Sequence, residues 1–317
     1  LFLERYVEDA RHVEVQVIAD AHGDVRHVFE RECSLQRRHQ KVVEEAPCAV
    51  LSEAERATIC ESGRAFAAQV NYVGAGTVEF LFDPVRREHY FLEMNTRLQV
   101  EHPVSELVSG VDLVMAQLRI ARGESLVSQP AFAGGVSLRG HAVEVRIYAE
   151  DPSAGYLPQV GTLTRVVWPN APFVRVDTGY EQGDDVAMHY DPMLAKIIAW
   201  GADRAEAIDR LIAALRETVL HGVVTNLPML IDVLLRDEVR GADFHTGSLG
   251  AWYGNEGPGL DVLTDDLNFI GVNAAGHGGP LATHQVDASV GEVDGMGGMD
   301  PWASLTGQRF DHGRGDA

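Results

Sequence analysis

Residues 74–103, GAGTVEFLFDPVRREHYFLEMNTRLQVEHP, contain the pattern that decides the fold of the first part of the chain. Two runs rich in β-branched and aromatic residues, 76–83 and 89–96, flank the turn sequence PVRRE. This arrangement predicts an antiparallel β-hairpin. If the hairpin folds about Arg86, Glu79 and Glu93 stand directly opposite each other.

Two carboxylates at opposed positions repel each other unless a cation lies between them. Asn95 follows Glu93 by two residues and is therefore expected on the same side of the strand. Two carboxylates and an amide oxygen form a set of hard oxygen ligands that suits Mg²⁺ or Mn²⁺ together with phosphate groups. The alternative is a solvated strand face with two unrelated glutamates. The opposite face is expected to point to the core, with Val78, Phe80, Phe82, Leu92 and Met94.

The same alternation continues beyond the hairpin and brings Arg97, Gln99 and Glu101 to the side of Glu93. A guanidinium group can bind a small planar oxyanion such as bicarbonate through two hydrogen bonds. A neighbouring carboxylate can act as a base if its surroundings tune it. Spacing alone leaves open the alternative that Arg97 and Glu101 merely pair with each other.

Upstream of the hairpin, residues 12–20 alternate valine with polar residues, which predicts a half-buried strand, and residues 25–32 are expected to be its return strand. Ser52 and Glu55 form a capping-box sequence that begins a predicted helix ending near residue 70. After Pro103 the pattern becomes helical as far as Gly123. The four-residue spacing there involves Leu113, Gln117 and Ala121.

Downstream, residues 127–250 predict an α+β lobe. Strand-like runs at 141–149, 162–168 and 195–200 are followed by helical patterns at 202–220 and 227–237. The first helix has an apolar stripe of Ile208, Leu211, Ile212 and Leu215. Residues 251–317 are rich in glycine and aspartate and lack either period, which favours a linker or disorder. The expected domains are therefore 1–126, 127–250 and 251–317.

The composition is that of a globular protein, with 45% hydrophobic and 23% charged residues among 317. A formal net charge of −21 argues against nucleic-acid binding, and no apolar run approaches the roughly 20 residues that cross a membrane. Three cysteines without metal-type spacing predict reduced thiols in a cytoplasmic protein. The chain begins without methionine or a signal peptide and is expected to continue upstream.

Several stretches together resemble the biotin carboxylases, the ATP-grasp component of biotin-dependent carboxylases. The block EMNTRLQVEHPVSE at 93–106 resembles the family's signature. Four further blocks occur in the family's order, and they are ERECSLQRRHQKVVEEAP at 30–47, YVGAGTVEFLF at 72–82, RGHAVEVRIYAEDP at 139–152 and YDPMLAKIIAWG at 190–201. The resemblance spans residues 1 to roughly 248. It implies an α+β fold: an ATP-grasp lobe with an antiparallel sheet, followed by the biotin carboxylase C-terminal domain.

The resemblance also implies a ligase that uses ATP and bicarbonate to carboxylate carrier-bound biotin through carboxyphosphate. It implies metal ligation and contact with the ATP phosphates by Glu79, Glu93 and Asn95. Bicarbonate would be bound by Lys41, Arg97, Gln99, the backbone of Val100 and Glu101, with Glu101 as the base. Arg146 would contact biotin and stabilise its enolate. The other nucleotide contacts would be Glu4, Arg5, Tyr6, Val7, His12, Gln36 and His39. Glu14 has no assigned role, and Arg37 and Arg38 are expected to be surface charges.

The implied partners are a biotin carboxyl carrier protein or domain, a carboxyltransferase subunit and a second copy bound through the C-terminal domain. Neither a nucleic acid nor a membrane is an expected partner. Residues 251–317 lack the Met-Lys-Met pattern of biotinylated carriers, so biotin is expected from elsewhere. The family's glycine-rich phosphate loop has no counterpart in residues 1–250, so the chain alone is expected to be inactive. The alternatives are another ATP-grasp ligase, such as a carbamoyl phosphate synthetase half, or a truncated non-catalytic assembly module.

Overall fold

The computed structural model describes residue 3 and residues 5–254, which all belong to one compact unit. Glu4 and the predicted linker from residue 255 onward lie outside the described residues. In the described part of the chain, no helix is long and apolar enough to span a bilayer. The three cysteines are free and buried, as expected.

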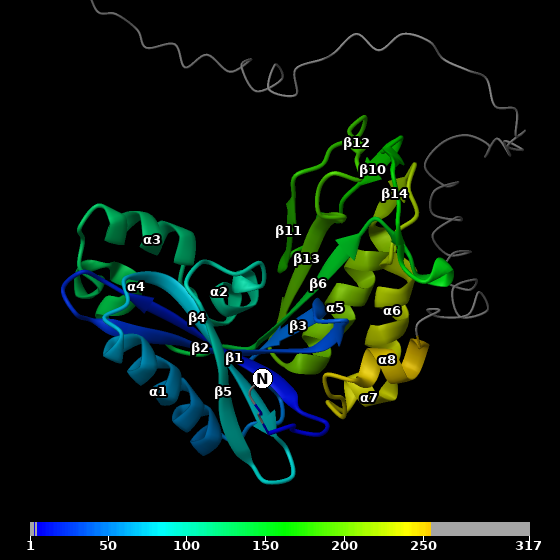
Figure 1. The fold of residues 1–317 in the computed structure, drawn as a ribbon. Helices are drawn as coiled ribbons and strands as arrows, with labels where there is room; N and C mark the ends of the chain where they lie inside the picture. Colours follow the sequence, from blue (N-terminus) through cyan, green and yellow to red (C-terminus); the bar gives the residue numbers. More distant parts are fainter. Residues whose placement is uncertain (1–2, 4, 255–317) are drawn as a thin grey trace, which may run out of the picture. The chain divides into compact units, whose positions relative to one another are not determined.

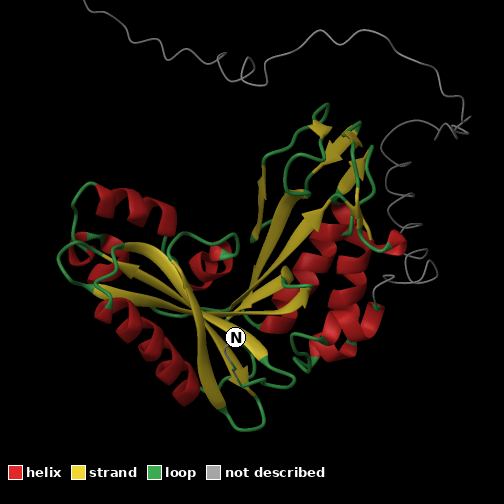
Figure 2. Cartoon of the chain, in the orientation of Figure 1, coloured by secondary structure: helices red, strands yellow, loops and turns green. Residues whose placement is uncertain are grey.

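An eight-stranded sheet forms the framework, and every pair of neighbouring strands in it is antiparallel (Figures 1 and 2). In spatial order its strands are β11 (Val174–Thr178), β13 (Met193–Gly201), β6 (His141–Tyr148), β3 (Gln40–Ala46), β2 (Val25–Arg37), β1 (Arg11–Ala19), β4 (Gly74–Asp83) and β5 (Glu88–Asn95). The pairing of β3 with β6 joins the two predicted lobes in one sheet. The predicted α+β class with an antiparallel sheet is confirmed.

The remaining elements are short strands and helices around this sheet. The short strands pair as β7 (Glu150–Asp151) with β8 (Leu157–Pro158), β9 (Gly161–Thr162) with β12 (Asp185–Val186), and β10 (Arg165–Val167) with β14 (Val219–His221). The helices are α1 (Glu53–Gln69), α2 (His102–Ser109), α3 (Leu113–Ala121), α4 (Pro130–Ala133), α5 (Arg204–Glu217), α6 (Leu227–Leu235), α7 (Asp237–Arg240) and α8 (Ser248–Tyr253), with 3₁₀ turns at Leu126–Ser128 and Pro152–Ala154.

Helix α1 begins at the predicted capping box, in which Ser52 and Glu55 each bond the other's backbone N–H. It packs against one face of β1 and β4, where Val13, Val15 and Val17 form a buried cluster with helix residues such as Ile59. The other face of β1 is buried as well, because no residue of the strand is more than 6% exposed. The prediction of a half-buried strand is therefore wrong. The alternation there separates an apolar layer from a buried polar one.

The β4–β5 hairpin forms in the predicted register, with Glu79 opposite Glu93. A bulge next to this pair then shifts the register, so that Phe80 faces Phe91. The bulge leaves Leu92 47% exposed instead of in the core. The sequence expectation for Leu92 is therefore wrong, because strict alternation does not anticipate an extra residue.

The helical pattern after Pro103 is divided between α2 and α3. Gly110 adopts a left-handed conformation with φ 74° and ends α2. In α3 the buried positions are Leu113, Ala116 and Ile120 rather than the predicted four-residue series. The prediction of one continuous helix over this region is therefore wrong.

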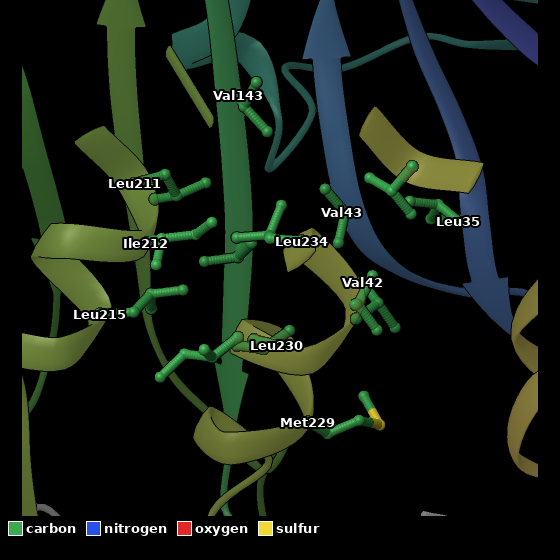
Figure 3. Close-up of a cluster of buried hydrophobic side chains, with 14 of the residues drawn as sticks. Leu35, Val42, Val43, Val143, Leu211, Ile212, Leu215, Met229, Leu230 and Leu234 are labelled. Atoms are coloured by element: carbon green, nitrogen blue, oxygen red, sulfur yellow. The ribbon is translucent and has the colours of Figure 1, made fainter. Parts of the chain in front are cut away.

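In the second lobe, α5 and α6 cover one face of the sheet at β6 and β13 (Figure 1). The four predicted stripe residues of α5 are all buried. They pack with α6 and with valines of β3 and β6 in the largest apolar cluster of the described residues (Figure 3). The cluster includes Leu35, Val42, Val43, Val143, Leu211, Ile212, Leu215, Met229, Leu230 and Leu234.

A buried ion cluster ties this lobe to the first one. Glu45 of β3 accepts hydrogen bonds from Arg204 of α5 at 2.6 and 3.1 Å and contacts His141 Nε2 of β6 at 2.7 Å. Burial raises the pKa of Glu45, but the Arg204 charge and the His141 hydrogen bond outweigh it and lower the pKa to about 2. This lowered pKa stabilises the fold above the ordinary value of 4.5, and the contribution is lost as pH falls toward 2.

The cluster therefore predicts a specific acid sensitivity. When the pH falls from 6 to 3, the unmodified chain should lose roughly 2 kcal/mol more of its free energy of unfolding than Glu45→Gln loses. Urea unfolding followed by circular dichroism at several pH values measures this difference. An identical pH dependence of the two proteins would contradict the assignment. Glu53→Gln, an exposed change at the start of α1, is the matched control.

Candidate active site

A cavity of about 910 Å³ brings together side chains from β1, β2, β3, β4, β5 and β6. Its wall includes nearly all of the site residues predicted from the sequence. They are Arg5, Tyr6, Val7, His12, Gln36, His39, Lys41, Glu79, Glu93, Asn95, Arg97, Gln99, Val100 and Arg146. One predicted residue among those described does not line it, because Glu101 is fully buried behind the wall. Glu4 lies outside the described residues.

The predicted metal ligands converge on one point of the wall. The Asn95 side-chain amide donates to Glu79 Oε1 at 2.9 Å and to Glu93 Oε1 at 3.1 Å. A donor thus occupies the position between the two carboxylates where a cation would lie. The two ends of an asparagine amide are assigned from such contacts, and a rotated Asn95 would present its oxygen instead. The donor set therefore fits a hard divalent cation.

Glu79 is kept ionised for such a role. Its Oε2 lies 2.8 Å from His12 Nε2, and its Oε1 also accepts from Gln99 at 3.2 Å. Burial raises the pKa of Glu79, but the His12 hydrogen bond and the Lys41 charge outweigh it and lower the pKa to about 2. At neutral pH the site therefore carries a carboxylate in a partly enclosed position.

Glu101 stands between two cations. Its Oε1 accepts from Lys41 Nζ at 2.5 Å and its Oε2 from Arg146 Nη2 at 2.9 Å. Arg97 does not pair with it. The Arg97 guanidinium instead donates to Gln99 Oε1 at 3.0 Å and to Asn95 Oδ1 at 3.4 Å, and it remains exposed at the cavity wall. An exposed guanidinium therefore lies beside the predicted metal ligands and is accessible to an anion.

Lys41 also connects the site to the buried polar layer of β1. Its Nζ donates to Glu14 Oε2 at 2.7 Å and lies 3.5 Å from Glu79 Oε1. Glu14 is fully buried, and its second oxygen accepts from Arg31 Nε. The sequence assigned no role to Glu14. The structure places it as the carboxylate that holds Lys41 from behind the cavity.

Several neighbours of the site were missed by sequence reasoning. Lys196 of β13 donates to the backbone carbonyl of Val100 and lies 3.3 Å from Asp177. Glu44 of β3 accepts from Arg146 Nε at 2.5 Å. Lys196 lies within the stretch at 190–201 that resembles the family, so a signal for it was present. Its contact with the 97–101 segment depends on the tertiary fold.

Two adjacent arginines lie at the end of β2, where Arg37 is the last residue of the strand and Arg38 follows it. Arg37 pairs with Glu150 at 3.2 Å and lies 3.8 Å over the Tyr156 ring. Arg38 lines the cavity. The expectation of a solvated surface charge is wrong for Arg37, which the β3–β6 pairing places against the second lobe, and it is confirmed for Arg38, which is exposed.

Two family models match parts of the chain. Residues 1–129 match the family model described as the carbamoyl-phosphate synthase L chain, ATP binding domain, and residues 144–251 match the biotin carboxylase C-terminal domain. The α subunit of mitochondrial methylcrotonoyl-CoA carboxylase of Rattus norvegicus is 45% identical over 247 residues, which are 78% of this chain and 34% of that one. The chain thus spans about a third of the length of this curated relative.

Two solved structures are similar over most of the described residues. One is a biotin carboxylase in complex with a βγ-ATP ligand from Campylobacter jejuni, at 40% identity and a TM-score of 0.74, covering 78% of this chain and 54% of that one. The other is the biotin carboxylase domain dimer of the Hydrogenobacter thermophilus 2-oxoglutarate carboxylase with MgADP, ADP and bicarbonate. It has 38% identity and a TM-score of 0.76, covering 81% of this chain and 56% of that one.

The fold and the two matched models define the class: an ATP-grasp domain followed by a biotin carboxylase C-terminal domain. The first model alone would also admit the carbamoyl phosphate synthetase alternative. The second model, the relative and the two structures resolve that choice. The chain belongs to the biotin carboxylase family.

Proposed function

We propose that this chain takes part in the ATP- and bicarbonate-dependent carboxylation of biotin, within a biotin-dependent carboxylase. The observation that carries the proposal is the position of Glu101. This buried carboxylate lies between Lys41 and Arg146, next to the cavity wall that holds the metal-ligand set. A base, an anion site and a phosphate-binding metal site are the components that phosphorylation of bicarbonate requires.

The reaction proposed for these groups begins at the exposed guanidinium. Arg97 and Gln99 would bind bicarbonate, with Lys41 and the backbone of Val100 completing the anion site. Glu101 would accept the bicarbonate proton while the bicarbonate oxygen attacks the γ-phosphorus of ATP and ADP leaves, which forms carboxyphosphate. A divalent ion held by Glu79, Glu93 and Asn95 would supply charge neutralisation to the phosphates.

The second half of the reaction would use Arg146. Carboxyphosphate would break down to CO₂ and phosphate, the released phosphate would take the proton from the ureido N1 of biotin, and N1 would then form its bond to the carbon of CO₂. Arg146 lies at the cavity wall with its Nη2 on Glu101, so its positive charge is available to the enolate that develops on the ureido oxygen. The arginine would thus couple the base for bicarbonate to the biotin site.

The nucleotide end of the cavity is proposed to lie toward the amino-terminal strand. The contacts proposed there are Glu4, Arg5, Tyr6, Val7, His12, Gln36 and His39, together with Glu79 and Glu93 at the phosphates. Tyr6 is 84% exposed, so an adenine ring has an accessible aromatic surface. Arg5 lies over the Tyr90 ring at 5.7 Å, on the adjacent hairpin.

The wider organisation is also proposed. We infer an ATP-grasp portion at 1–126, a C-terminal domain at 127–250 and a linker at 251–317. The proposed partners are a biotin carboxyl carrier protein or domain, a carboxyltransferase subunit and a second copy through the C-terminal domain. The Hydrogenobacter relative is a dimer, which supports the last of these. Three free cysteines favour the cytoplasm, although the rat relative is mitochondrial.

Binding measurements on the 317-residue chain test the proposal directly. In the presence of Mn²⁺ and ADP, Arg97→Met should weaken bicarbonate binding by at least about tenfold. Arg146→Met should instead reduce biotin binding. Calorimetry and saturation-transfer NMR measure the two affinities, and Arg64→Met on the surface of α1 is the control. Bicarbonate binding that ignores Arg97 would refute the anion site.

Ligand binding tests the one remaining alternative, a truncated non-catalytic assembly module. Turnover cannot do so, because the chain alone is expected to hydrolyse no ATP in response to bicarbonate: no glycine-rich phosphate loop lies in residues 1–250. Binding of biotin that depends on Arg146 favours a catalytic biotin carboxylase. Absence of metal, bicarbonate and biotin binding together would favour a non-catalytic assembly module.

A further inference from the structure

Glu144 of β6 is a buried carboxyl group that the proposed reaction does not use. It is fully buried, and neither of its oxygens has a hydrogen-bond partner among the described residues. Its directly opposed neighbour on β3 is Glu44. Glu44 is also fully buried, and its Oε2 likewise lacks a partner within residues 5–254.

The cations around Glu144 are already engaged. Arg146, two residues along β6, donates to Glu44 and Glu101. Lys196 of β13 donates to the Val100 carbonyl and lies 3.3 Å from Asp177. On the side of α2, Val104 and Val108 pack on Ala46 and Ala142. The same helix also carries the buried and titratable His102, whose Nδ1 contacts the Gln99 carbonyl and whose Nε2 has no hydrogen-bond partner among the described residues.

Two opposed carboxylates in such a place cannot both remain ionised. An ionised carboxylate without a partner is strongly disfavoured in a buried site, and a like charge directly opposite disfavours it further. Burial raises the pKa of Glu44 to about 7 even though the Arg146 charge opposes this, but Glu44 at least holds a cation through the hydrogen bond from Arg146 Nε at 2.5 Å. Glu144 has no such bond among the described residues, so Glu144 is the member that keeps the proton. Burial raises the pKa of Glu144 well above its ordinary value; the Lys196 charge opposes this, while Glu44 raises the pKa further.

We propose that Glu144 is a neutral carboxylic acid and a positioning residue for Arg146. Its O–H group donates to the free oxygen of Glu44 after a side-chain rotation, and the other Glu44 oxygen holds Arg146 Nε. The chain Glu144, Glu44, Arg146, Glu101 thereby fixes the guanidinium from behind the cavity. The inference has two parts. The positioning of Arg146 for biotin rests on the proposed function, whereas the neutral state of Glu144 stands independently of it.

The first test is infrared spectroscopy of the 317-residue chain at pH 7. A protonated carboxylic acid has a carbonyl stretch above the amide I band, and Glu144→Gln should remove one such band. Glu181→Gln, at an exposed glutamate of the second lobe, should leave the spectrum in that region unchanged. A spectrum of Glu144→Gln that retains every acid band would show that Glu144 is ionised and would overturn the proposal.

The positioning role is tested by the side-chain Nε–H NMR signal of Arg146, assigned by its loss in Arg146→Lys. Glutamine retains a donor toward Glu44, so Glu144→Gln should preserve the signal. Glu144→Met removes the donor and should shift or broaden it. If the signal is the same in the unmodified chain, in Glu144→Gln and in Glu144→Met, the positioning role is overturned. These readouts need no substrate, so they stay informative if biotin fails to bind.

Thermal unfolding supplies a test that does not depend on the methionine variant folding. Below pH 4.5, the ordinary value, the carboxyl group is protonated in both the folded and the unfolded chain and does not affect the free energy of unfolding. Above pH 4.5 only the unfolded chain ionises, so the free energy of unfolding falls as the pH rises. As the pH rises from 5, the unfolding midpoint of the unmodified chain should therefore fall relative to that of Glu144→Gln, by roughly 3–5 °C per pH unit until Glu144 ionises in the folded state. A constant difference between the two proteins would contradict a protonated Glu144.

Discussion

Replacing Arg31 by Met should lower the free energy of unfolding by about 3–5 kcal/mol, because it leaves a buried carboxylate without its closest cation. Arg31 is fully buried where β1, β2, β4 and α2 meet. Its guanidinium donates to four side chains: Glu14, Gln16 at 2.7 Å, Thr77 at 3.0 Å and Ser105 at 3.2 Å. The loss of these four contacts is sufficient to explain so large an effect.

Urea unfolding followed by circular dichroism measures this loss. Arg26→Met on the same strand is the matched control, because Arg26 pairs with Asp24 near the surface and should cost less than about 1 kcal/mol. The double variant Arg31→Met with Glu14→Gln should recover part of the loss, since it removes the uncompensated charge. Equal effects of the Arg26 and Arg31 changes would contradict the account.

The Arg31 contact also reaches the candidate active site. Burial raises the pKa of Glu14, but the Arg31 and Lys41 charges outweigh it and keep that pKa well below its ordinary range. Without Arg31, Lys41 would be the remaining cation on Glu14. Lys41 would then be drawn away from Glu101, which it contacts at 2.5 Å. The stability of the buried polar layer of β1 and the geometry of the proposed base Glu101 therefore both depend on Lys41.

The local sequence pattern was sufficient to predict the elements that depend on residues close together in the sequence. The capping box at Ser52, the β4–β5 hairpin and the Glu79–Glu93 register all follow from turn residues and alternation, and all are present. The apolar stripe of α5 is likewise buried as predicted. The capping box and the hairpin register are fixed by contacts within one helix or one hairpin, and the α5 stripe follows from the helical period, although its burial comes from packing on α6 and the sheet.

Features that depend on distant strands were beyond such reasoning. Both faces of β1 are buried because helices pack on one side and a polar network fills the other, so Glu14 carries no sequence mark of its burial. The bulge at Leu92 adds a residue that alternation cannot reveal. Lys196 reaches Val100 only through the sheet order, in which β13 lies next to β6. Strand order and irregularity therefore account for most of the differences.

The predicted metal ligands Glu79, Glu93 and Asn95 give the most direct test of what the β4–β5 hairpin contributes to the site. Glu79→Gln should weaken Mn²⁺ binding by at least about 100-fold, because it replaces a charged ligand at the centre of the set by a neutral amide. Glutamine preserves the shape of the side chain. Its amide can still meet Asn95 and Gln99, so the hairpin is expected to remain folded.

Electron paramagnetic resonance of Mn²⁺, titrated with the 317-residue chain in the presence of ADP, measures the affinity. Glu88→Gln, at an exposed glutamate near the turn of the same hairpin, should leave it unchanged. Since a ligand that binds only the folded state stabilises it, Mn²⁺ should raise the unfolding midpoint of the unmodified chain and of Glu88→Gln but not of Glu79→Gln. If Glu79→Gln binds Mn²⁺ as tightly as Glu88→Gln, the two facing carboxylates do not form the metal site, and the bicarbonate-activating chemistry built on them must be rejected.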